Sequence, residues 1–168
     1  YMTGNMNLKH LGQFMDKTFS GRLNEDKIAA LRDMWKGKLV LKGVASEADA
    51  EAAVRLGFDG MILSNHGGRQ LDAGPSTIST LQDFGAKYKD RIKVMMDSGI
   101  RSGVDVARAL TSGAEFTFMG RSFMYGVAAL GKEGGNHTIS ILKRQLQQVM
   151  EQTSTESTDA FTKSLYKR

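Results

Sequence analysis

The sequence contains no cysteine among its 168 residues. Disulfide bonds, thiolate metal sites and cysteine nucleophiles are therefore excluded. The absence of cysteine fits a reducing compartment such as the cytoplasm. Apolar runs are short, and none approaches the roughly 20 residues that a membrane-spanning helix needs. We therefore expect a cytoplasmic protein, with peripheral association at the inner face of a membrane as the open alternative.

Aromatic residues make up only 8% of the chain, and basic residues, although in excess, are not clustered. The formal net charge is +5, but no run of five or more Lys and Arg residues occurs. Nucleic-acid-binding domains usually concentrate their basic residues in a patch or along one helix. The pattern favours a solvated basic surface, and no nucleic-acid partner is expected.

Short apolar runs alternate with amphipathic stretches along the chain. The apolar runs predict strands at 38–43, 60–65, 92–97 and 115–120. Helices are expected to begin near Asn24, at Ser46, near Pro75, at Ser102 and at about Thr138. Strands that alternate with helices indicate parallel βαβ units, and therefore an α/β fold with its helices on one side of the sheet.

One sequence phrase occurs twice. Ser46 to Asp49 and Ser102 to Asp105 both have the Ser-x-x-Asp spacing of a helix-capping box. Both helices then run the same distance to a glycine, Gly57 or Gly113, which is the residue type preferred after the last helical turn. Each helix leads directly into a strand, as repeated βαβ units require.

Charged or glycine-rich residues follow every predicted strand. Lys42 ends the first strand, residues 64–69 follow the second, Asp97 ends the third, and Gly120-Arg121 follows the fourth. In a βα barrel the loops at the carboxyl ends of the strands converge on one pocket. Four strand ends that deliver such residues to one rim indicate a functional site there.

The second of these loops, Ser64-Asn65-His66-Gly67-Gly68-Arg69-Gln70, is the most informative. His66 could act as a general base, the role that histidine most often has in catalysis, and Arg69 can hold a carboxylate through two parallel hydrogen bonds. A single loop histidine is more often structural than catalytic. A base and a carboxylate-binding arginine in one glycine-rich loop favour the catalytic interpretation.

Two further segments predict a phosphate site. They are Asp97-Ser98-Gly99-Ile100-Arg101-Ser102-Gly103 and Met119-Gly120-Arg121-Ser122. Backbone amides of the glycine loops, the N-terminus of the helix at Ser102 and two guanidinium groups would converge on a dianion. The alternative is two ordinary βα turns with surface arginines. A phosphate site alone identifies no reaction.

The order and spacing of four segments resemble the FMN-dependent (S)-2-hydroxy-acid oxidases and dehydrogenases, the family of glycolate oxidase and L-lactate dehydrogenase. The segments are 39–43, 64–72, 97–101 and Gly120-Arg121, and the resemblance covers about residues 1–150. The Ser-Asn-His-Gly-Gly-Arg-Gln stretch is the specific part. Other FMN barrels, such as IMP-dehydrogenase-like enzymes and type 2 isopentenyl diphosphate isomerases, share the Asp-Ser-Gly-Ile-Arg part more loosely and lack the His-Gly-Gly-Arg loop.

The resemblance implies the C-terminal half of a (β/α)8 TIM barrel that binds FMN, uses no metal and oxidises a small 2-hydroxy acid to the 2-oxo acid. Lys42 would lie beside flavin N1 and O2, and Ser64 would hydrogen-bond the isoalloxazine. His66 would be the catalytic base next to the flavin, and Arg69 would bind the substrate carboxylate. The ribityl chain and phosphate would be held by Asp97, Ser98, Gly99, Ile100, Arg101, Gly120 and Arg121.

The family barrel has eight strands, of which this sequence supplies four, and the chain begins with Tyr1. We therefore expect a piece of a longer protein: a loop region at 1–23, the half-barrel at 24–152 and a loosely ordered tail at 153–168. The isolated piece is expected to be inactive. Two alternatives stay open, a non-catalytic half-barrel that binds FMN or phosphate weakly or assembles with itself or a partner half, and a phosphate-binding barrel with other chemistry. Also open are the particular acid, homo-oligomer formation, and whether oxygen, a quinone or a cytochrome accepts the electrons.

Overall fold

Residues 12–14 and 23–161 are described by a computed structural model, and the chain divides into two units between Met34 and Trp35. In the first unit, helix α2 (Glu25–Met34) begins where the sequence predicts, because the Asn24 side chain accepts a hydrogen bond from the Lys27 amide at 3.0 Å. Most of the expected loop region 1–23 lies outside the described residues, and residues 12–14 within it are helical. The expected half-barrel region 24–152 thus begins in one unit and continues in the other.

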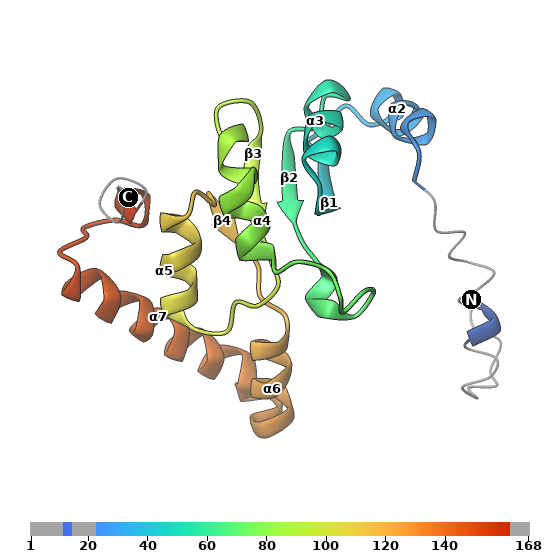
Figure 1. Ribbon diagram of the computed structural model, residues 1–168. Helices are drawn as coiled ribbons and strands as arrows, with labels where there is room; N and C mark the ends of the chain where they lie inside the picture. The colour runs from blue at the N-terminus through green and yellow to red at the C-terminus, as the bar shows by residue number, and fades with distance from the viewer. Residues whose placement is uncertain (1–11, 15–22, 162–168) are drawn as a thin grey trace. The chain divides into compact units, whose positions relative to one another are not determined.

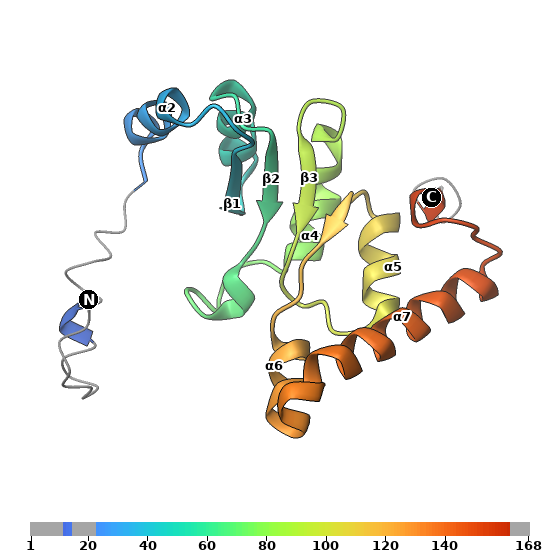
Figure 2. The ribbon, with the colours of Figure 1, turned by 180° about the vertical axis from the view of Figure 1, so that it is seen from behind.

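The second unit is built on one parallel sheet with the strand order β1-β2-β3-β4. Its strands are β1 (Val40–Val44), β2 (Gly60–Leu63), β3 (Lys93–Met96) and β4 (Phe116–Thr117). All four point towards the same end of the sheet, where the 3₁₀ turn η1 (His66–Gly68) and helix α6 (Arg121–Leu130) lie (Figure 2). The predicted parallel order is confirmed.

Strand β4 is shorter than the expected 115–120. Its pairing with β3 nevertheless extends beyond the two residues of regular strand. The Glu115 amide donates to the Val94 carbonyl at 2.8 Å, and the Phe118 amide donates to the Met96 carbonyl at 2.9 Å. The chain therefore stays attached to the sheet as far as the loop that carries Gly120 and Arg121.

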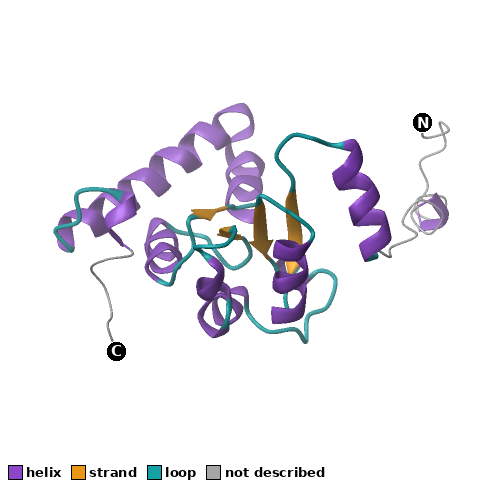
Figure 3. Ribbon diagram, turned by 90° about the horizontal axis from the view of Figure 1, so that it is seen from above, coloured by secondary structure: helices purple, strands orange, loops and turns teal. Residues whose placement is uncertain are grey.

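Helices connect the strands and lie on one face of the sheet (Figures 1 and 3). They are α3 (Glu47–Arg55), α4 (Thr77–Asp83) and α5 (Gly103–Thr111), with the 3₁₀ turn η2 (Gly85–Tyr88) before β3. Both expected Ser-x-x-Asp caps are present, since the Ser46 and Ser102 side chains accept from the amides of Asp49 and Asp105. No helix in the described part of the chain is long and apolar enough to cross a membrane.

The core lies between the sheet and these helices. Alternate residues of a strand face opposite sides, and the residues on the helical side are almost completely buried. These residues are Val44, Met61, Leu63, Val94 and Met96. On the opposite side no helix of the described part of this unit covers the strands (Figure 2), and Val40, Phe116 and Phe118 are 40%, 55% and 40% exposed. The sheet therefore has one packed face and one apolar face that is largely open.

Two carboxylate side chains accept hydrogen bonds from backbone amides at the amino ends of β1 and β3. Glu115 accepts from the amide of the fully buried Val94 at 2.8 Å and pairs with the ammonium group of Lys93. Asp59, just before β2, makes the same two contacts at the start of β1, accepting from the Leu39 amide at 2.9 Å and pairing with Lys38. Each carboxylate accepts a hydrogen bond from a backbone amide, so these contacts at the amino end of the sheet contribute to stability.

Replacing Glu115 with Ala is therefore expected to lower the free energy of unfolding by about 1–3 kcal/mol, the cost of leaving a buried amide unpaired. Glu115→Gln keeps an acceptor oxygen and should retain most of that stability. Glu47→Ala is the matched control, because its carboxylate makes only an exposed ion pair with Lys87 at 3.7 Å. Urea unfolding followed by circular dichroism measures the three variants, and equal stability of the Glu115→Ala and Glu47→Ala chains would contradict this role.

The C-terminal part of the chain consists of η3 (Gly131–Glu133), the long helix α7 (Gly134–Gln152) and the 3₁₀ turn η4 (Thr158–Ala160). Helix α7 begins one turn before the expected start near Thr138. For residues 153–161 the structure differs from the expected loose tail, because Phe161 is fully buried against Ala107 and Leu110 of α5. Residues 162–168 lie outside the described part of the chain.

Candidate active site

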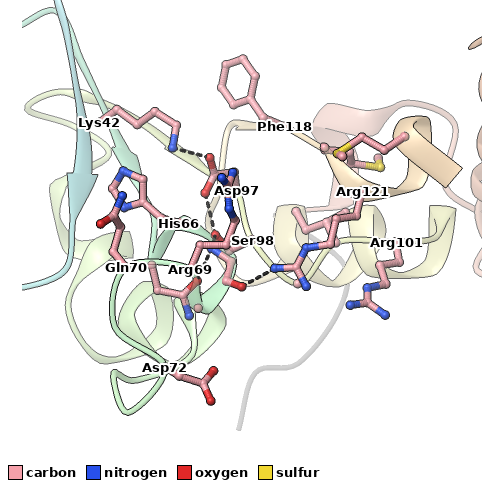
Figure 4. Close-up of a pocket in the computed structure, with 18 residues that line it drawn as sticks. Lys42, His66, Arg69, Gln70, Asp72, Asp97, Ser98, Arg101, Phe118 and Arg121 are labelled. Carbon is pink, nitrogen blue, oxygen red and sulfur yellow. Dashed lines mark hydrogen bonds and ion pairs between the residues drawn. The ribbon is translucent and has the colours of Figure 1, made fainter. Parts of the chain in front are cut away.

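A cavity of about 850 Å³ opens at the carboxyl ends of the four strands. This volume falls in the range of roughly 300–1,000 Å³ that is usual for small-molecule sites. Of the eleven site residues predicted from the sequence, ten line the cavity, and Figure 4 shows how those labelled lie around it. The ten are Lys42, His66, Arg69, Asp97, Ser98, Gly99, Ile100, Arg101, Gly120 and Arg121.

Ser64 is the predicted residue that does not line the cavity. Its side chain is buried, and its hydroxyl accepts hydrogen bonds from the Lys42 ammonium group and the His66 amide, both at 3.1 Å. The structure therefore places Ser64 behind Lys42 and His66, where it supports both residues.

Lys42 and Asp97 form an ion pair at 2.7 Å that joins β1 to the loop after β3 (Figure 4). Burial alone raises the pKa of Asp97, but hydrogen bonds from Lys42, Ser64 and Ser98 outweigh burial and hold that pKa below its ordinary value. The stabilisation from this pair is therefore present above the ordinary aspartate pKa and is lost as the pH falls through the lowered one. At neutral pH the cavity contains a carboxylate and an ammonium group side by side.

The His66 side chain lies over Gly43, a residue to which the sequence alone assigned no role. Gly43 has a φ of +98° at an irregularity in β1, a conformation that side chains disfavour. A Cβ atom at this position would come within 3.0 Å of His66 Cε1. Glycine is required here both for the backbone and for the space that the imidazole occupies.

The loop after His66 is held from both sides at Gly67. The Gly67 amide donates to Asn65 Oδ1 at 2.9 Å and to Ser98 Oγ at 3.0 Å, and the Gly67 carbonyl accepts from the Arg121 guanidinium. Asn65 is a second residue whose part the sequence reading missed. What could have indicated a role for Asn65 is its position inside the Ser-Asn-His-Gly-Gly-Arg-Gln stretch, the most specific motif of the sequence. Arg69 follows this turn, and its exposed side chain is on the wall of the cavity.

The expected contribution of the helix at Ser102 to phosphate binding is wrong in one respect. The amides of Arg101 and Ser102 donate to Asp105 at 3.1 and 3.0 Å, and the Gly103 amide donates to Gln145 at 2.9 Å. Because side chains of the protein already use these donors, the first turn of α5 has few amides left for an anion.

Helix α6 offers the better anion-binding terminus. Among the described residues, no side chain caps its first turn, which starts after Gly120. Its amides and positive dipole end lie beside the Arg121 guanidinium, and Figure 4 shows Arg101 on the same side of the cavity. The combination of an uncapped helix terminus and two guanidinium groups suits a phosphate dianion. Among the described residues no group of three His, Asp or Glu side chains is arranged for a metal ion.

The comparison with protein families gives one match. The model of the FMN-dependent dehydrogenases matches residues 2–168. The L-lactate dehydrogenase of Alcaligenes faecalis is 37% identical over 155 residues, which are 92% of this chain and 41% of that protein. The L-lactate dehydrogenase of Vibrio cholerae serotype O1 (strain M66-2) is 42% identical over 127 residues, or 76% and 34% of the two chains.

Solved structures show the same relationship. A mandelate oxidase matches with a TM-score of 0.79 and 34% identity, covering 84% of this chain and 42% of that one. A lactate oxidase of Pediococcus acidilactici matches with a TM-score of 0.82 and 28% identity, covering 98% and 46%.

The chain has a parallel βα sheet with a glycine-rich, charged pocket at the carboxyl ends of its strands. This arrangement identifies its fold as part of a TIM barrel. The chain belongs to the FMN-dependent dehydrogenase family. It spans about two fifths of the length of the L-lactate dehydrogenases of Alcaligenes faecalis and Actinobacillus pleuropneumoniae, two of the curated relatives that it matches.

The residues present fit the FMN of this family. The uncapped α6 terminus and two arginines suit its phosphate, the cavity has room for a flat ring, and Lys42 places a positive charge inside that cavity. These residues come from three of the four strand ends, so the pocket depends on the folded sheet.

Proposed function

We propose that the complete protein to which this chain belongs oxidises a small (S)-2-hydroxy acid, of the L-lactate or glycolate type, to the corresponding 2-oxo acid. The observation that carries this proposal is the placement of His66 and Arg69. Both lie on one short turn that lines the same cavity as Lys42 and the proposed phosphate-binding residues. A base and a carboxylate-binding group are what a hydroxy acid requires from a site.

FMN, when bound, supplies the acceptor for the two electrons that the hydroxy acid loses. Arg69 binds the substrate carboxylate through its guanidinium fork, which fixes the orientation of the reacting carbon. His66 accepts a proton from the substrate on an imidazole nitrogen. Lys42, which lines the cavity, would supply a positive charge that stabilises negative charge on the bound flavin.

The relatives support the substrate class. Those compared above are named L-lactate dehydrogenase, mandelate oxidase and lactate oxidase. Lactate and mandelate share a carboxylate next to a carbon that bears a hydroxyl, and they differ in the group beyond. The proposed contacts of His66 and Arg69 involve only the shared part, so these two residues define the class of acid.

Anaerobic reduction of the flavin in the full-length protein tests the proposal. L-lactate or glycolate is expected to bleach the flavin absorbance, and D-lactate serves as the control because its hydroxyl has the opposite configuration. A flavin that no 2-hydroxy acid reduces, in a protein that binds FMN, would contradict the proposed reaction.

The open face of the sheet favours a second candidate for the isolated chain, that of a half-barrel which assembles with a partner half or with itself. Val40, Phe116 and Phe118 expose apolar surface there, and β1 and β4 are the outer strands of the described sheet, the kind of strand to which another chain can add. Flavin absorbance and sedimentation of the purified 168 residues separate the two candidates. An associated chain without flavin supports the second, and a monomer that turns over lactate excludes it.

A further inference from the structure

Three consecutive residues of the loop after β2 have positive φ angles. They are His66 at 54°, Gly67 at 68° and Gly68 at 75°. For the two glycines this conformation is easy, but for His66 it is disfavoured, since the Cβ atom crowds the backbone. A side chain stays in such a conformation only where its surroundings hold it there.

The contacts that hold this turn converge on one amide. The N–H group of Gly67 points between Asn65 Oδ1 at 2.9 Å and Ser98 Oγ at 3.0 Å, and donates to both. This peptide unit directly follows the His66 α-carbon. Its orientation therefore fixes the backbone of His66 and the direction in which the imidazole leaves it.

Each of the two acceptors is itself anchored. Asn65 donates through Nδ2 to the Pro75 carbonyl at 3.2 Å, which ties the start of the loop to its end. Ser98 donates its hydroxyl proton to Asp97 Oδ1 at 2.8 Å. Because that proton is already given to Asp97, the Ser98 oxygen is left to accept from Gly67.

Ser98 has a φ of 73°, a backbone conformation that serine rarely adopts and glycine adopts easily. A serine at such a position is under strain that glycine would relieve. The Ser98 hydroxyl makes two hydrogen bonds, with Gly67 and Asp97, and these bonds offset the strain.

We propose that Asn65 and Ser98 are positioning residues that share the Gly67 amide and hold His66 in its left-handed conformation. This inference rests on the proposed function, in which His66 is the base. Neither residue acts on the substrate through these contacts, and both act through the peptide unit between His66 and Gly67. Arg121 holds the carbonyl of Gly67 from the opposite side and completes the arrangement.

Sharing one donor predicts how the two substitutions combine. Asn65→Ala or Ser98→Gly alone leaves the Gly67 amide one acceptor, so each is expected to lower the limiting rate of flavin reduction by about threefold. Both together leave the amide without either acceptor, and a displaced base costs about 100-fold. The loss is therefore larger than the product of the single losses, as residues in one network show. Ser98→Gly keeps the backbone conformation without strain, so its effect reports the hydroxyl alone.

The conservative variant Asn65→Asp retains the acceptor for Gly67. Combined with Ser98→Gly, it is expected to keep the rate within about threefold of Ser98→Gly alone, whereas Asn65→Ala in the same combination costs about 100-fold in total. The affinity for FMN should change by less than about threefold in the Asn65 variants, because Asn65 is not among the residues proposed to hold FMN. A purely structural role would lower FMN affinity together with the rate, and would not distinguish Asp from Ala. Stopped-flow reduction of the full-length, FMN-loaded enzyme by L-lactate measures the rates.

A second measurement needs no substrate. Exchange of the Gly67 amide hydrogen, followed by mass spectrometry or NMR, is expected to be at least about tenfold faster in the double variant than in either single one, because an unbonded amide exchanges freely. If the wild-type flavin is not reduced but Gly67 exchange follows this order, the proposed reaction fails and the positioning of His66 stands. Unchanged exchange in the double variant, or rate losses that simply multiply, would overturn the positioning role.

Discussion

Replacing His66 with Gln is expected to slow flavin reduction by a 2-hydroxy acid by about 10²–10⁴-fold, the usual contribution of general base catalysis. Glutamine has a similar size and can hydrogen-bond, but it cannot accept a proton at neutral pH. FMN should remain bound, since the residues proposed to hold its phosphate lie on other loops. Anaerobic stopped-flow measurement with L-lactate or glycolate in the full-length protein gives the rate.

The same substitution at His137 is the matched control, because this histidine is exposed on α7 and does not line the cavity. His137→Gln should reduce its flavin at the wild-type rate. A His66→Gln enzyme whose flavin bleaches as fast as that of His137→Gln would exclude His66 as the base.

Removing both Arg101 and Arg121 should weaken FMN binding by about 10²–10⁴-fold, since each charged hydrogen bond contributes about 1.5–3 kcal/mol. Riboflavin lacks the phosphate, so its affinity should fall only a few-fold. The comparison of the two ligands removes any effect that the loss of Arg121 has on the Gly67 carbonyl, because that effect is common to both.

Isothermal titration or fluorescence quenching of the full-length apoprotein measures the four affinities. Arg144→Ala, which removes an exposed guanidinium of α7 outside the cavity, is the control for the change in net charge. Equal losses of affinity for FMN and riboflavin would contradict the proposal that Arg101 and Arg121 bind the phosphate.

The order of the sheet could be predicted from the sequence because each strand is a short apolar run between turn signals. The start of α7 and the packing of Phe161 in the tail could not. Gly134, Gly135 and Asn136 are poor helix formers, so the pattern places the start of α7 near Thr138. In the structure Gly134 packs so closely against Gly126 of α6 that neither position has room for a side chain, and this helix contact outweighs local propensity.

The tail shows a second limit of the sequence. Residues 153–158 are Ser- and Thr-rich, which indicates a loose segment, but Phe161 is fully buried against α5 and α7. A single apolar residue forms no periodic pattern, so the sequence could not indicate that Phe161 packs against α5.

The positions of the candidate site residues followed from the strand ends, but the way they are supported did not. The sequence identified His66 and Arg69 through their chemistry, which depends on residue type. Asn65 and Gly43 act through a hydrogen bond and through empty space, and both depend on which backbone atoms lie nearby. Such roles can be recognised only in the folded structure.

The ion pair of Lys42 and Asp97 has a consequence for folding. Lys42 belongs to β1, and Asp97 directly follows β3. Because β2 separates β1 from β3 in the sheet, the pair forms only when all three strands are in place. A partly folded chain in which β1 has not docked has neither the pair nor the pocket. Since a ligand that binds only the native state stabilises it by mass action, flavin favours the fully assembled sheet over every partly folded form.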